Sequence, residues 1–128
     1  MSISIHPTHS CFDDALDFLA NLLRDNPGLA DAGTVHLVHG ILLTPATSEP
    51  FAHAWVEYSG AVWQCGILNG KRICYGMDPT EFAEKLRPQD VTRYTPRQAW
   101  KENERSNTFG PWVERYQELC RKPAEAAP

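Results

Sequence analysis

Two residues in this sequence, Cys11 and His53, have the side chains that thiol chemistry needs. Cys11 follows Ser10, a good N-cap residue, and begins a stretch with helical spacing, where unpaired backbone N–H groups and the helix dipole stabilise a thiolate. His53 begins a stretch typical of a β-strand, and an imidazole beside a thiol can accept its proton. The pair predicts an activated nucleophile. The alternative is a small buried Cys11 and an ordinary, partly buried His53.

Four short segments stand out around these two residues: Cys11-Phe12, Val38-His39-Gly40, His53-Ala54-Trp55-Val56-Glu57 and Val62-Trp63. Together they resemble the transglutaminase-like branch of the papain-like cysteine enzymes. The family order is a cysteine on a helix, a histidine on a strand and an acid or amide on the next strand. Two later segments, Arg93-Tyr94-Thr95 and Phe109-Gly110-Pro111-Trp112, resemble parts of small bacterial and phage proteins of this type.

The family pattern implies an Asp at position 64, where this chain has Gln64. A two-residue turn at Ser59-Gly60 would pair Trp55 with Gln64 and place Gln64 diagonally from His53 on the same face of the sheet. An amide oxygen can orient an imidazole, but it lacks the charge that stabilises imidazolium. Asp78 is the alternative orienting residue.

The resemblance therefore implies a cysteine hydrolase or acyltransferase that uses Cys11 as nucleophile, His53 as base and Gln64 as orienting residue. Its substrate would be a peptide or a small amide or ester, and the acyl group would pass to water or to an amine. The missing Asp motivates a second hypothesis, an inactive binding or interaction module that retains the transglutaminase-like fold.

The four other histidines are further candidates for a role in or near the site. His39 would line the site, cap a loop or pack in the core, and core packing is favoured. His36 would face the opposite side of the same strand, which argues against joint metal binding. His6 or His9 could complete an oxyanion hole with the backbone N–H of Cys11, or be surface histidines. We expect no metal and no cofactor.

Asn69-Gly70 is a strong hairpin signal that predicts the pairing of Cys65 with Cys74. The two side chains would lie within disulfide range, on the face opposite Gln64. In a reducing compartment two neighbouring thiols are favoured over a disulfide.

The hydrophobic patterning predicts a single α+β domain over residues 1–122, with a frayed tail over 123–128. An N-terminal helix would pack on an antiparallel sheet, and further helices would follow. The expected helices are 11–24, 79–86, 96–104 and 111–121, and the expected strands are 34–44, 52–58, 61–68, 71–75 and an edge strand at 91–94.

Composition limits the classes of partner. Twelve Lys and Arg against sixteen Asp and Glu give a net charge of −4, which argues against nucleic acid. No apolar run has the roughly 18 residues of a membrane helix, and the first ten residues do not resemble a secretory signal, so we expect a cytoplasmic protein that does not bind membranes. The four tryptophans, Trp100 among them, are expected to pack in the core and at its rim.

Overall fold

The computed structural model describes residues 11–43 and 49–126, except for the side chains of 67–68 and 121–126. The helices are α1 (Cys11–Asp25), the short 3₁₀ helix η1 (Pro27–Ala30), α2 (Pro79–Leu86), α3 (Pro96–Ser106) and α4 (Glu114–Ala126). The strands are β1 (Val35–Leu42), β2 (Phe51–Tyr58), β3 (Ala61–Leu68), β4 (Lys71–Met77) and β5 (Gln89–Tyr94). The α+β class is confirmed, with each expected element present.

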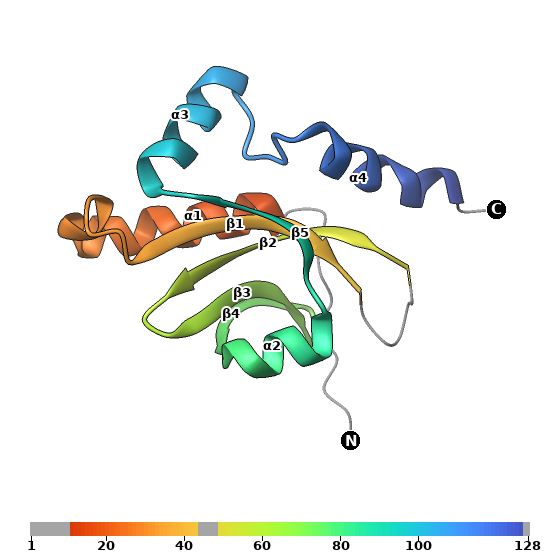
Figure 1. The fold of residues 1–128 in the computed structure, drawn as a ribbon, viewed down its shortest axis with the longest axis horizontal. Helices are drawn as coiled ribbons and strands as arrows, with labels where there is room; N and C mark the ends of the chain where they lie inside the picture. The colour runs from red at the N-terminus through yellow and green to blue at the C-terminus, as the bar shows by residue number, and fades with distance from the viewer. Residues whose placement is uncertain (1–10, 44–48, 127–128) are drawn as a thin grey trace.

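The strands form one antiparallel sheet in the order β4-β3-β2-β1-β5 (Figure 1). The expected edge position of β5 is therefore confirmed. Helices α1, α3 and α4 cover one face of this sheet, and α2 covers the other (Figure 1). We call these two faces the α1 side and the α2 side.

Two tight turns fix the register of the hairpins. Ser59 and Gly60 have φ values of 55° and 74°, and Asn69 and Gly70 have φ values of 52° and 79°. Positive φ at both central residues is the geometry of the type I′ turn, whose twist suits antiparallel strands. Tyr58 therefore pairs with Ala61, as the sequence predicts.

At the start of α2 and of α3, a side chain accepts hydrogen bonds from backbone N–H groups that have no acceptor within the helix. The Asp78 carboxylate accepts from the backbone N–H groups of Thr80 and Glu81 at the start of α2. Thr95 forms a reciprocal capping box with Gln98 at the start of α3. The expected cap of α1, Ser10, lies outside the described residues.

Helix α4 differs most from the expectation at both of its ends. It begins at Glu114 rather than at Pro111, and the peptide bond between Gly110 and Pro111 is cis. It continues to Ala126, so residues 123–126 are helical although the sequence predicted a frayed tail there.

The sheet is buried on both sides. The core on the α1 side includes Cys11, Phe12, Leu19, Leu37, Ala54 and Val56. The core on the α2 side includes Val38, Leu42, Trp55, Val62 and Phe82. Alternation along β2 sends Ala54 and Val56 to the first core and Trp55 to the second.

Candidate functional site

His53 and Gln64 meet on adjacent strands, as the register predicts. The distance between His53 Nε2 and Gln64 Oε1 is 2.9 Å, and the two residues are buried. The Gln64 amide nitrogen donates to Tyr75 Oη and Met77 Sδ, both at 3.2 Å. Gln64 Oε1 is therefore the acceptor for His53, which places the imidazole proton on Nε2.

The second ring nitrogen of His53, Nδ1, is buried and has no hydrogen-bond partner among the described residues. The same holds for Nε1 of Trp55, two residues further along β2. Burial lowers the pKa of His53 to about 4, against a smaller opposing effect of the bond with Gln64. His53 is therefore neutral at pH 7, with a bare lone pair on Nδ1.

Cys11 lies in the first turn of α1, as expected, but its thiol is buried in the core. Only 5% of the residue is exposed. Burial raises the pKa of Cys11 to about 12, although the backbone amides of Ala54 and Phe12 lower it in part. The expectation of a depressed thiol pKa is therefore wrong, because loss of solvent outweighs the helix terminus.

The structure places Cys11 and His53 on opposite sides of the sheet. Cys11 packs with Ala54 on the α1 side. His53 is the neighbour of Ala54 along β2, and adjacent strand residues point to opposite faces. The imidazole of His53 is nearly parallel to the indole of Trp55, with the ring centroids 6.1 Å apart, and Trp55 belongs to the core on the α2 side. The expected cleft contact between the thiol and the imidazole is not formed.

Among the histidines that the structure describes, His39 is the one that shares the α1 side with Cys11. It pairs with Ala54 across β1 and β2 and is completely buried. Three aromatic rings surround it, those of Phe12, Tyr94 and Trp112, at centroid distances of 4.7, 5.2 and 5.0 Å. Neither ring nitrogen has a partner among the described residues, and burial lowers the pKa of His39 to about 3. His39 is thus a neutral part of the core.

The second hairpin carries a disulfide on the α1 side. Cys65 and Cys74 are paired as expected, with their Cα atoms 4.0 Å apart, and their sulfurs are bonded to each other. The sequence favours two thiols in a reducing compartment, but the hairpin register brings the two sulfurs close enough to bond. The Cys65 sulfur also approaches the backbone oxygen of Asp14 in α1, and Arg72 of β4 donates to the Asp14 carboxylate at 2.8 Å.

The remaining candidates have other roles or cannot be placed. Asp78 caps α2 and does not contact His53. His6 and His9 lie outside the described residues. Over residues 11–43 and 49–126 there is no group of three or more acidic, Cys or His residues that could hold a metal ion. Over the same residues no helix has the length and hydrophobicity to cross a membrane.

Comparison with family models, with curated proteins and with solved structures finds no match to this chain. The site is therefore interpreted from its own geometry. That geometry contains a histidine oriented by an amide on one side of the sheet and a buried, protonated thiol on the other.

Proposed function

We propose that this chain is a non-catalytic binding or interaction module that keeps the element order of a transglutaminase-like domain. The order is a cysteine at the start of a helix, a histidine on a strand and an amide on the next strand. Cys11, His53 and Gln64 occupy these positions. What the arrangement lacks is the contact between the thiol and the imidazole.

One observation carries the proposal: Cys11 packs with Ala54 on the α1 side, whereas His53, the preceding residue of β2, points to the α2 side. Attack by a thiol on a carbonyl requires a thiolate, which an adjacent base forms by accepting the proton. Here the thiol interacts with the backbone of Ala54, whereas His53 Nδ1 lies on the other face of the sheet with no partner among the described residues. Burial raises the pKa of the Cys11 thiol, so the thiol stays protonated.

The experiment is a burst assay with p-nitrophenyl acetate, an activated ester that reports on an acyl-enzyme. We expect no burst of p-nitrophenol and equal steady rates for the unmodified chain and for Cys11→Ser. Cys120→Ser is the matched control, because Cys120 is exposed and also lies outside the disulfide. A burst stoichiometric with protein that Cys11→Ser abolishes and Cys120→Ser preserves would refute the proposal.

A second candidate function, a cysteine hydrolase or acyltransferase acting on a peptide or a small amide or ester, is favoured by the bond between His53 and Gln64. An imidazole oriented by an amide oxygen is the arrangement that papain-like enzymes use. For Cys11 to act as nucleophile and His53 as base and then acid, the first turn of α1 would have to bring the sulfur to the side of His53.

This second candidate has its own test in Gln64→Asp. A carboxylate at position 64 would stabilise imidazolium, so an enzyme of this kind would hydrolyse the ester faster. An unchanged rate in a folded Gln64→Asp protein would refute acyl chemistry at His53. The non-catalytic proposal predicts that unchanged rate.

A further inference from the structure

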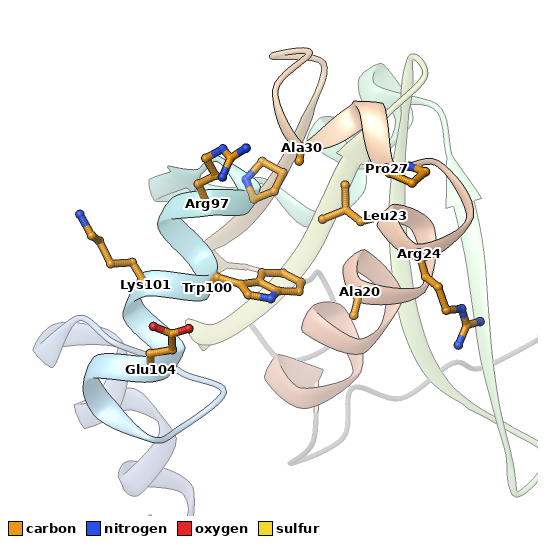
Figure 2. Close-up of a pocket in the computed structure, with 10 residues that line it drawn as sticks. Ala20, Leu23, Arg24, Pro27, Ala30, Arg97, Trp100, Lys101 and Glu104 are labelled. Atoms are coloured by element: carbon orange, nitrogen blue, oxygen red, sulfur yellow. The ribbon is translucent and has the colours of Figure 1, made fainter.

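Two features of the chain lie apart from the three predicted site residues. One is a groove between α1, η1 and α3, which the side chains of Leu23 and Trp100 face (Figure 2). Its lining, as far as the structure describes it, contains no cysteine, histidine or hydroxyl side chain. The other feature is the disulfide between Cys65 and Cys74 in the hairpin of β3 and β4. This disulfide is the feature that can undergo a reaction.

The two cysteines of the disulfide differ in their access to solvent. Cys65 lies on β3 and is only 7% exposed. Cys74 is exposed and lies on β4, which is an edge strand of the sheet, so no further strand within the described residues covers it (Figure 1). A thiol in solution can therefore reach the disulfide at Cys74 more readily than at Cys65.

The pairing of β3 with β4 does not depend on this bond. The turn at Asn69-Gly70 and the backbone ladder of the two strands already place Cys65 opposite Cys74. The two cysteines are only 9 residues apart in the sequence, and a disulfide that closes a short loop restricts the unfolded chain less than one that closes a long loop. The bond can therefore open while the hairpin keeps its register.

The reduced state also has a hydrogen-bond acceptor for the buried cysteine. The sulfur of Cys65 lies 3.9 Å from the backbone oxygen of Asp14 in α1. A thiol at this position can donate its S–H to that oxygen, whereas a disulfide sulfur has no proton to donate. The thiol of the exposed Cys74 would be solvated. Both redox states are thus compatible with the packing of β3 against α1.

We propose that the disulfide between Cys65 and Cys74 is a reversible thiol–disulfide exchange site that reacts with a small thiol of the glutathione class. Disulfides that are exposed are the labile and regulatory ones. The sequence also predicts a cytoplasmic protein, and disulfides of that compartment are usually transient, catalytic or redox-sensing. The site does not involve Cys11 or His53, so it is independent of the function proposed above.

The exchange has two steps. The thiolate of one glutathione attacks the sulfur of Cys74, which forms a mixed disulfide and releases Cys65 as a thiolate that takes up a proton. A second glutathione thiolate attacks the glutathione sulfur of the mixed disulfide, which forms oxidised glutathione and releases Cys74, and Cys74 also takes up a proton. The protein disulfide is reduced by two electrons, and two glutathione molecules are oxidised to one disulfide.

The first experiment equilibrates the unmodified, full-length protein with glutathione buffers, approached from both the oxidised and the reduced protein. Acid quenching, alkylation in urea and peptide mass spectrometry then report the redox state of each cysteine. We expect Cys65 and Cys74 to be reduced together in a buffer poised like a reducing cytosol, and to be oxidised again when oxidised glutathione is added, with an unchanged circular dichroism spectrum. A disulfide that glutathione reduces only after the protein is unfolded would overturn the proposal.

The second experiment tests which cysteine is attacked, in a Cys120→Ser background that removes the exposed free cysteine. Cys65→Ser leaves Cys74 as a thiol, and the matched variant Cys74→Ser leaves Cys65. Oxidised glutathione should form a mixed disulfide with Cys65→Ser faster than with Cys74→Ser by about tenfold or more, because only Cys74 is exposed. Equal rates in the two folded variants, or a faster reaction at Cys65, would overturn the assignment of Cys74 as the attacked sulfur.

Discussion

The buried histidines on the two sides of the sheet differ in their hydrogen bonding. On the α2 side, Gln64 accepts from His53 and donates to Tyr75 and Met77, while His53 Nδ1 and Trp55 Nε1 have no partner among the described residues. On the α1 side, His39 is enclosed by aromatic rings and has no hydrogen bond within the described residues. The hydrogen bonds of Gln64 favour one register of strands β2, β3 and β4. The imidazole of His39 contributes packing only, and its burial without a hydrogen bond costs free energy.

The two residues that the sequence pairs, Cys11 and His53, are divided between these two sides. The thiol of Cys11 is buried in the core of the α1 side, whereas the ring of His53 lies near Trp55 on the α2 side. Each histidine is neutral, and burial raises the pKa of the thiol. A cysteine and a histidine in the expected order along a chain therefore form a catalytic pair only if both side chains lie on the same side of the sheet.

The largest expected effect is the loss of stability in mild acid. Burial lowers the pKa of His39 to about 3 and that of His53 to about 4, below the unperturbed value. The unfolded chain therefore binds protons first, so stability is complete above about pH 6.5 and falls as the pH decreases toward the folded values. At pH 5 the loss is about 2 kcal/mol for each histidine.

Urea unfolding at pH 7 and pH 5 measures this loss. His39→Leu removes one of the two titrating groups without breaking a hydrogen bond that the structure describes, so it should reduce the difference between the two pH values by about half. Equal unfolding free energies at pH 7 and pH 5 would show that the two histidines are not buried in neutral form.

A smaller effect is expected from breaking the hydrogen bonds of Gln64 on the α2 side. Gln64→Leu removes the acceptor of the buried His53 Nε2–H and should destabilise the protein by about 1–3 kcal/mol. The same kind of change on the α1 side, His39→Leu, breaks no such bond and should cost much less at pH 7. The midpoints of urea unfolding at pH 7 compare the destabilisation caused by Gln64→Leu with that caused by His39→Leu. Equal costs would contradict the distinction between the two sides.

The smallest expected effect concerns the ion pairs on the α1 side. Arg72 binds the Asp14 carboxylate, which is 3% exposed, so Arg72→Met should cost about 1–2 kcal/mol. Arg97→Met breaks a fully exposed pair with Asp31 and should leave the unfolding midpoint unchanged. Thermal unfolding of both variants provides the comparison. An unchanged midpoint for Arg72→Met would show that the hairpin is not held to α1 by this pair.

The local features of the fold could be predicted from the sequence. The turn residues Ser59-Gly60 and Asn69-Gly70 give the hairpin registers, and these registers predict both the bond between His53 and Gln64 and the proximity of Cys65 to Cys74. The hydrophobic patterning predicts the bounds of α2 and α3 to within two residues. All of these depend on contacts between residues near one another in the chain.

The side of the sheet that α1 covers could not be predicted. Four successive residues of β2, His53 to Val56, are buried, so alternation gives no polar face that would identify the solvent side. Either face could therefore have received Cys11. The exposure of Trp100 could not be predicted for a similar reason. It depends on how α3 packs against the rest of the protein, and the residue type alone predicts only packing in the core or at its rim.

The most direct test of the separation of Cys11 from His53 is the rate of alkylation of each cysteine by iodoacetamide, followed by peptide mass spectrometry. In the native protein at pH 7, Cys120 should be alkylated while Cys11 remains unmodified, and Cys11 should react only after unfolding in urea. Selective alkylation of native Cys11 at pH 6, faster than that of Cys120, would require an activated thiolate and would contradict the account.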